Sequence, residues 1–340
     1  MQTTAPSLSH PLRSRRLGLR PGVHVLRRDA EHLQVGLDPA RAVVLPDSEA
    51  VRALLAALAD PAARVGAEEY DGTTLAVLSD SGLLMDADTL LPLVPSVPAV
   101  NPPPGPAPCP PRSGVAALAA QDGDTVGALL TARAASHVDV LVTGSPEARE
   151  VASSLDALLS LSGVPNRAVT FPAAVSVVDP PVDTPTAGLL VAVGEPAREL
   201  LDPWVRAAVP HLLLRLVEGH AVVGPFVLPG ETACLRCVDA HHTDVDPSWP
   251  LLIAQYATAV ERPRHDTVPE PVDPVLAALA TAWAARELVS HAEGRRPPTA
   301  STTVRLDPHL TTLETHCWPR HPACGCTWAD DLAASATMDA

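Results

Sequence analysis

Short apolar runs alternate with amphipathic stretches along most of this chain. Apolar runs bounded by polar turns are typical of strands, and apolar residues every three or four positions are typical of helices. In the front part this pattern predicts strands at residues 23–27, 32–37 and 41–45. It then predicts a helix capped by Asp47 or Ser48, with Val51, Leu54, Leu55 and Leu58 as its apolar stripe. The stretch from 74 to about 91 predicts a further helix or strand.

The second half of the chain repeats strand and helix patterns in alternation. Strands are predicted at 137–143, 167–171, 188–193, 210–216 and 221–228, and helices at 146–162, 203–208 and 248–260. A long helix is predicted to begin with Asp273 as its cap and Pro274 in its first turn, and to stop near Gly294. Residues 302–306 and 310–315 predict a hairpin-like pair. This order favours an α/β fold with a doubly wound, Rossmann-like sheet.

Changes in composition predict the domain organisation. Residues 1–20 are polar and basic without periodicity, so we expect them to be disordered. Residues 21–91 predict a small α+β module. Half of the residues in 92–111 are proline, which favours an extended linker, with Cys109 as a bystander. Residues 112–330 hold the α/β domain, and 331–340 form a tail.

The charge balance restricts the partners of this chain. Its formal net charge is −15 at pH 7. Nucleic acid and anionic membranes attract basic surfaces, so we expect neither as a partner. No apolar run has transmembrane length, and no apolar stretch of the kind found in signal peptides follows the N-terminal arginines. We therefore expect a cytoplasmic protein, in which paired cysteines favour metal binding over a disulfide.

Two cysteine pairs near the C-terminus carry the most specific chemistry. Cys234 and Cys237 form a C-x-x-C motif, and Cys324 and Cys326 form a C-x-C motif. Four thiolates in two such pairs are typical of a tetrahedral, structural zinc site, so we predict Zn²⁺ bound by these four residues. A redox role for the first pair is the alternative.

Other polar residues near these pairs leave further alternatives open. Cys317 could replace one thiolate as a ligand, and His241 and His242 follow the first pair closely enough to be considered as ligands. Asp239, Asp244 and Asp246 predict an acidic loop, which is either a solvated turn or a contact with a partner.

The cysteine segments resemble a known superfamily. Residues 224–237 are similar to the ubiquitin-activating and thiamine-biosynthesis (ThiF-like) adenylyltransferases, and the longer string 234–250, followed by 321–326, is more specific. Within that superfamily the longer string resembles an actinobacterial branch of cyclodehydratase-like, leader-peptide-binding proteins of thiazole/oxazole-modified peptide (bacteriocin) biosynthesis. The resemblance implies a Rossmann-like domain with a C-terminal four-cysteine zinc site. It also implies a winged-helix-like module for peptide recognition at the front, and a homodimer.

The nucleotide site that this resemblance implies is degenerate. Only Gly144 remains of the glycine-rich turn after the first strand, where Pro146 removes a backbone donor and Glu147 adds a negative charge. Phe171 and Pro172 stand where an acidic residue for the ribose is expected. Glu195 is the one substitute for the acidic magnesium site of the superfamily. We therefore list Gly144 and Glu195 as cofactor-binding candidates, and expect ATP chemistry to be lost or weakened.

These observations lead to one expected function and one alternative. We expect a zinc-stabilised, non-adenylating scaffold that binds a leader peptide or a separate ATP-using (YcaO-like) enzyme. The peptide would add to a sheet edge at residues 23–27 or 32–37. The alternative is an ATP-dependent adenylyltransferase that activates a carboxylate. No motif for serine-based catalysis or for a Walker-type phosphate loop is present.

Overall fold

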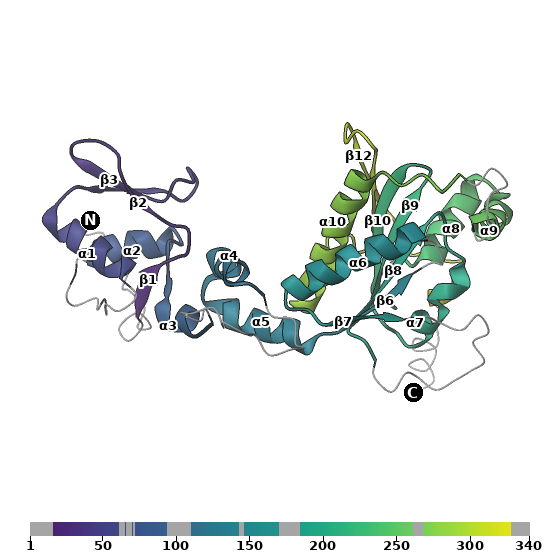
Figure 1. The fold of residues 1–340 in the computed structure, drawn as a ribbon, viewed down its shortest axis with the longest axis horizontal. Helices are drawn as coiled ribbons and strands as arrows, with labels where there is room; N and C mark the ends of the chain where they lie inside the picture. Colours follow the sequence, from purple (N-terminus) through teal and green to yellow (C-terminus); the bar gives the residue numbers. More distant parts are fainter. Residues whose placement is uncertain are drawn as a thin grey trace, which may run out of the picture. The chain divides into compact units, whose positions relative to one another are not determined.

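The structure is a computed structural model that describes residues 16–60, 65, 70, 72–93, 110–142, 146–169, 184–260 and 268–327. Contacts divide the chain into two compact units. The front unit holds residues 1–106 and 110–131, and the second unit holds 107–109 and 132–340 (Figure 1). The division falls after Thr131, whereas the sequence pattern placed the start of the α/β domain at 112.

The front unit contains two small sheets and the helices packed on them. Strands β2 (Val25–Arg27), β3 (His32–Val35) and β4 (Val43–Pro46) form an antiparallel sheet in the order β2-β3-β4, at the predicted positions. Helix α1 (Glu49–Ala59) follows, and its N-cap Ser48 accepts a hydrogen bond from the Val51 backbone N–H. The four predicted stripe residues of α1 are all buried. The stretch after residue 71 contains both a helix and a strand, α2 (Gly72–Asp80) and β5 (Leu84–Asp86).

Strand β1 (Leu17–Leu19) corrects one expectation. It lies inside the segment that was expected to be disordered, and it pairs with β5 in an antiparallel sheet. Leu17 is buried in the front core. A three-residue strand whose partner lies so far along the chain has no local signal in the sequence, so the pattern missed it.

Several short helices precede the large sheet. They are α3 (Ala87–Leu90), the 3₁₀ turn η2 (Leu91–Leu93), α4 (Arg112–Asp122), the 3₁₀ turn η3 (Gly123–Thr125) and α5 (Val126–Ala135). The sequence pattern did not resolve α4 and α5. Most of the proline-rich stretch, residues 94–109, lies outside the described residues.

The second unit is built on a seven-stranded sheet in the order β12-β11-β10-β9-β8-β6-β7. Its strands are β6 (Val138–Val142), β7 (Asn166–Val169), β8 (Ala187–Val193), β9 (His211–Val217), β10 (His220–Val227), β11 (Thr302–Leu306) and β12 (Leu313–Cys317). β7, β6, β8 and β9 are parallel, whereas β10, β11 and β12 continue the sheet antiparallel. The predicted parallel core and the predicted hairpin therefore belong to one mixed sheet.

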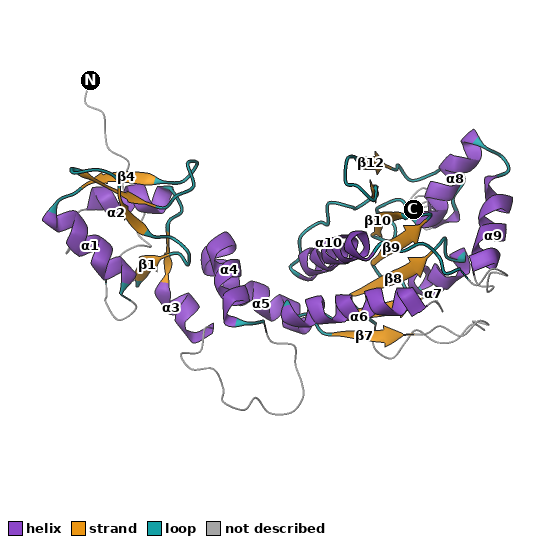
Figure 2. Cartoon of the chain, turned by 45° about the horizontal axis from the view of Figure 1, so that its top comes forward, coloured by secondary structure: helices purple, strands orange, loops and turns teal. Residues whose placement is uncertain are grey.

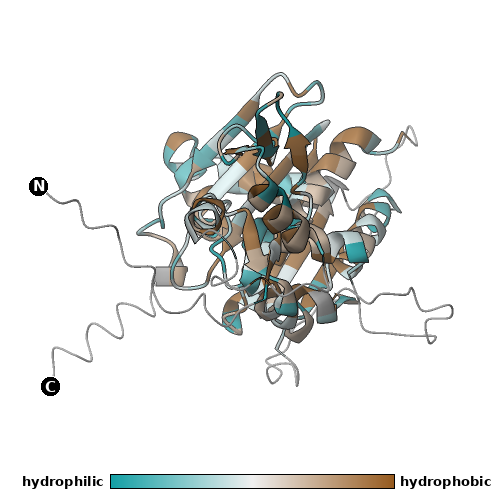
Figure 3. Ribbon diagram, turned by 90° about the vertical axis from the view of Figure 1, so that its left-hand side faces the viewer, coloured by the Kyte–Doolittle hydropathy of each residue, from teal (hydrophilic) through white to brown (hydrophobic). Residues whose placement is uncertain are grey.

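Helices cover both faces of this sheet, as a doubly wound fold requires (Figure 2). Helices α6 (Pro146–Leu161) and α10 (Pro274–Ala292) pack on one face. The other face carries the 3₁₀ turn η4 (Arg198–Leu201), α7 (Asp202–Arg206) and α8 (Leu235–Val245). Helix α9 (Trp249–Val260) follows α8 in the chain. Several strands of the sheet are apolar over most of their length, as expected for strands that are covered on both faces (Figure 3).

Alternation along β9 decides which side chains reach each face. Leu212, Leu214 and Leu216 belong to the core beneath α6 and α10, whereas Leu213 belongs to the core beneath α7 and α8. By the same period of two, His211 and Arg215 share the face of Leu213. Two polar side chains are thus buried on the face that also carries the cysteines.

Gly188 on β8 permits the close packing of α7 on that face. A Cβ atom at this position would lie 2.5 Å from the Trp204 ring, so any larger residue would push α7 away. Trp204 is buried in the core of this face.

Candidate metal centre and the neighbouring charge cluster

The four predicted cysteines come together at one end of α8. Cys234 is the N-cap of α8 and Cys237 lies in its first turn. Cys324 and Cys326 lie in the segment after β12, where η5 (Gly325–Thr327) begins. The Sγ atoms of Cys234 and Cys237 are 3.8 Å apart, those of Cys234 and Cys324 are 3.7 Å apart, and those of Cys237 and Cys326 are 3.4 Å apart.

These distances fit a tetrahedral zinc ion. A Zn–S bond of about 2.3 Å in tetrahedral geometry places neighbouring sulfur atoms about 3.8 Å apart. All four Sγ atoms lie within 4.8 Å of one another. The group can therefore hold a metal ion, and four thiolates would leave that ion no open coordination position.

The four thiols share hydrogen bonds, so their pKa values move in opposite directions: those of Cys234 and Cys326 lie above the ordinary value, and those of Cys237 and Cys324 lie below it. The pKa of Cys324 is lowered to about 6, chiefly because the Cys234 thiol hydrogen-bonds to it. The pKa of Cys237 lies below its usual range, because it accepts hydrogen bonds from Cys234, Cys324 and Cys326. A metal ion that binds all four sulfur atoms would release the protons that these thiols share.

The alternative ligands lie outside this cluster. Cys317 is exposed on β12 and is not part of the four-cysteine group. His241 belongs to a second group with Asp244 and His321, and His242 stacks on Trp249.

The second group forms a structural link between α8 and the C-terminal segment. His321 Nδ1 accepts a hydrogen bond from the Ala323 backbone N–H, so its proton is on Nε2, which donates to Asp244 over 2.9 Å. A ring held in this tautomer has no lone pair on Nε2 to offer a metal. His241 Nε2 in turn bonds the Pro319 carbonyl at 2.9 Å.

The predicted acidic loop is in fact helical. Asp239 and Asp244 lie on α8, and Asp246 is its C-cap. Asp244 binds His321, and Asp239 faces inward toward Arg198. Polar residues with few apolar positions between them carry a weak helical signal, so the sequence pattern predicts a loop here.

Asp239 is the centre of a largely buried charge cluster. Both of its carboxylate oxygens accept hydrogen bonds from Arg198, each over 2.8 Å, and Oδ1 also accepts from the Trp249 indole at 3.0 Å. Burial raises the pKa of Asp239, but the hydrogen bonds and charge of Arg198 outweigh it, so the pKa lies below its usual value. The carboxylate is therefore ionised at neutral pH.

Glu195 belongs to the same cluster. It follows β8, and its two oxygens bind two different arginines: Arg198 Nη1 at 2.8 Å and Arg215 Nη1 at 2.7 Å. The Glu195 side chain is 14% exposed. The sequence named Glu195 as a nucleotide-site candidate, but it did not reveal these two partners or the link through Arg198 to Asp239.

The other nucleotide candidate cannot be placed. Gly144 lies outside the described residues, as do Phe171 and Pro172. Pro146 is the first residue of α6, and Glu147 lies in its first turn. An acidic side chain at a helix N-terminus occupies the position that favours a bound anion.

Comparisons with known proteins give similar folds but no close relative. No protein-family model matches the sequence, and no curated protein matches it. A structure of the heterocyclase TruD matches with a TM-score of 0.61 at 17% identity, covering 92% of this chain and 43% of TruD. This chain thus spans less than half the length of TruD.

Structures of E. coli MccB match over nearly their whole length. The microcin C7 biosynthetic enzyme MccB in complex with N-formylated MccA matches with a TM-score of 0.55 at 11% identity, covering 92% of this chain and 99% of MccB. A structure of MccB with ATP also has a TM-score of 0.55.

TruD is named as a heterocyclase, and MccB is named as a microcin C7 biosynthetic enzyme. Among the described residues, no helix has the combined length and apolar character needed to cross a membrane. The chain therefore has the fold of the TruD and MccB structures, which agrees with the Rossmann-like sheet that the sequence pattern predicted.

Proposed function

We propose that this chain is a zinc-stabilised, non-adenylating scaffold that binds a leader peptide or a partner enzyme in the biosynthesis of modified peptides. The proposal rests mainly on the contacts of the Glu195 carboxylate. It is the one acidic candidate for a magnesium–nucleotide site, and each of its oxygens already binds a guanidinium. A metal ion there would have to displace Arg198 or Arg215 from a site that is mostly shielded from water.

Features at the start of α6 support the same proposal. Pro146 offers no backbone N–H to a phosphate, and Glu147 in the first turn repels one. A phosphate bound at this helix would meet a negative charge where ATP-binding folds provide donors.

The front unit offers an edge where a peptide could add as a strand. β2 is an edge strand of its sheet. The His24 carbonyl accepts from Gly36 and the Arg28 N–H donates to His32, so alternate residues between them also face β3. Val25 and Arg27 then direct their backbone N–H and C=O groups to the open edge. Val25 is 37% exposed, and its side chain would contact a bound peptide.

The opposite edge of this sheet, strand β4, is less suited to pairing with an added peptide strand. β4 ends in Pro46, which has no backbone N–H to donate. We therefore propose β2, at the first of the two predicted positions, as the edge that receives the peptide.

The neighbours suggest the class of partner. MccB has been solved with the peptide MccA, and a heterocyclase related to this chain in fold has been solved with a substrate and a cofactor. For this chain we propose a peptide partner, with a separate (YcaO-like) enzyme supplying ATP chemistry, and a homodimer formed through the α/β domain. The zinc ion would close the C-terminal segment onto α8 and contribute folding energy rather than chemistry.

Titration calorimetry of the zinc-loaded protein with Mg-ATP tests the proposal. We expect no binding heat at millimolar nucleotide. Stoichiometric binding, followed by pyrophosphate exchange with a carboxylate substrate, would instead establish the alternative, an adenylyltransferase. E. coli MccB, which has been solved with ATP, is the positive control.

A further inference from the structure

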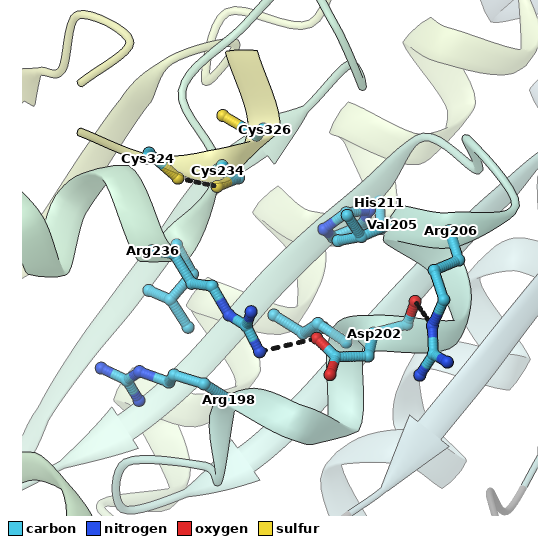
Figure 4. Close-up of a pocket in the computed structure, with 12 residues that line it drawn as sticks. Arg198, Asp202, Val205, Arg206, His211, Cys234, Arg236, Cys324 and Cys326 are labelled. Carbon is cyan, nitrogen blue, oxygen red and sulfur yellow. Dashed lines mark hydrogen bonds and ion pairs between the residues drawn. The ribbon is translucent and has the colours of Figure 1, made fainter. Parts of the chain in front are cut away.

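A pocket of about 420 Å³ lies on the face of the sheet that carries the cysteines (Figure 4). Leu201, Val205 and Leu235 form its apolar walls, and Cys234, Cys324 and Cys326 border one side. It reaches His211, the first residue of β9, which pairs with Gly188 at the start of β8. Glu195 lies beyond the end of β8 and does not line this pocket, although Arg198, which binds Glu195, does line it.

His211 is the unusual polar group of this pocket. Its Nδ1 lies 2.9 Å from the Val209 carbonyl, which can only accept, so the proton is on Nδ1. Nε2 is then a bare acceptor, and it has no hydrogen-bond partner among the described residues. Burial lowers the pKa of His211 to about 4, so the ring stays neutral and Nε2 keeps its lone pair at neutral pH. A buried acceptor without a donor is costly, so a ligand that supplies a donor is favoured.

Charges around the pocket oppose a charged ligand of either sign. Arg198 binds Asp239 and Glu195, and Arg236 binds Asp202 at 2.7 Å. Arg206 bonds the Asp202 backbone carbonyl and would repel a cation. Four thiolates around a divalent ion carry a net charge of about −2, which would repel an anion.

We propose that this pocket binds a neutral, mainly apolar group with a single O–H or N–H donor, such as a phenol or an indole, which hydrogen-bonds to His211 Nε2. The volume is in the range of small-molecule sites, which pair apolar walls with a few placed polar groups. A phenol can come from a free small molecule or from a tyrosine side chain of a bound protein or peptide. The proposal depends neither on ATP binding nor on the β2 edge.

The ligand needs a small movement of the pocket wall. His211 is 0% exposed, so a donor reaches Nε2 only after a wall side chain turns aside. Val205 is 38% exposed, whereas Leu201 and Leu235 are almost fully buried, so Val205 is the least enclosed of the three apolar wall residues.

The matched probes p-cresol and toluene test the proposal on the full-length, zinc-loaded protein. They differ by one hydroxyl group, and we expect p-cresol to bind about tenfold more tightly, the effect of one buried hydrogen bond. NMR of isotopically labelled histidine reports the mechanism directly, since p-cresol should shift the unprotonated Nε2 resonance of His211 and toluene should not. N-acetyl-tyrosinamide distinguishes the sources, because it binds if the pocket accepts a tyrosine side chain and fails if only a free phenol fits.

Two variants complete the test. His211→Phe removes the acceptor and should reduce p-cresol affinity to that of toluene. Val205→Trp fills the pocket from its partly exposed wall and should abolish binding of both probes while the fold is retained. Equal affinities of the two probes for the unmodified protein, an unshifted Nε2 resonance, or full p-cresol affinity in Val205→Trp would overturn the proposal.

Discussion

At the scale of single residues, Asp239 connects elements that are far apart in sequence. It binds Arg198 after β8 through two hydrogen bonds and Trp249 at the start of α9 through a third. Arg198 and Asp239 are 10% and 18% exposed, so the pair is shielded from water and removal of one partner leaves the other charge poorly compensated. Arg198 in turn binds Glu195, so Asp239 indirectly helps to hold the Glu195 carboxylate in place.

Asp239→Asn should therefore destabilise the protein by about 3 kcal/mol at neutral pH. The folded-state pKa of Asp239 lies below the ordinary value of 3.8, so its contribution is present above that value and is lost as the pH falls through the folded pKa. The variant should thus lose less stability on acidification than the unmodified protein. Urea unfolding at neutral pH and below pH 3.8 measures both effects. Glu199→Gln, an exposed neighbour, is the control and should change stability little.

Two cysteine substitutions, one inside the four-cysteine group and one outside it, test the predicted zinc ligands. Cys324→Ser removes one of the four grouped thiols, whereas Cys317→Ser removes an exposed thiol outside the group. Metal analysis of the purified proteins should find one zinc per chain in Cys317→Ser and markedly less in Cys324→Ser. Equal zinc contents in the two variants would refute the ligand set.

At the scale of elements, strand β2 forms an edge of the three-stranded sheet in the front unit, and only alternate residues of β2 direct their backbone groups outward. Residues of β2 alternate between facing β3 and facing outward, as the His24 and Arg28 bonds define. Local turns and alternation in the sequence were enough to predict β2, β3 and β4. They could not tell which residues of β2 face outward, because that depends on the register with β3.

Two proline substitutions distinguish the two sides of β2. Val25→Pro removes an outward N–H and should cost less than about 1 kcal/mol, whereas Leu26→Pro removes a ladder bond and should cost about 3 kcal/mol. Hydrogen exchange gives an independent measure, because the amides of Leu26 and Arg28 should be protected while those of Val25 and Arg27 exchange quickly. Similar protection of all four amides would show that the edge is already covered.

At the scale of the whole molecule, the cysteine cluster joins segments 90 residues apart in sequence. Closing such a long loop is costly in chain entropy, and a metal ion that binds only the folded state offsets this cost. Trp318 lies beside the cluster, 9% exposed, with its indole bound to Thr303 at 2.9 Å. The metal would thus hold β12 and the segment after it against α8.

Removal of zinc by a chelator should lower stability by about 4 kcal/mol when free zinc had exceeded its dissociation constant about a thousandfold. The loss should be reversed by zinc but not by magnesium, which prefers oxygen ligands. Thermal unfolding and the fluorescence of Trp318, which we expect to become exposed, provide the measurements. An unchanged melting temperature would mean that the fold does not depend on the metal.

Features that depend on neighbouring positions in the chain were predictable from the sequence alone. These include the two cysteine pairs, a cap at Asp47 or Ser48, of which the structure shows Ser48, the Asp273 cap, and the α6 and α10 helices. The tertiary structure alone decided the partners of Glu195 and Asp239, the pairing of β1 with β5, and the pocket at His211. These depend on residues that meet only when the sheet forms and α7 and α8 pack on one of its faces, and local patterning carries no information about which distant side chains come into contact.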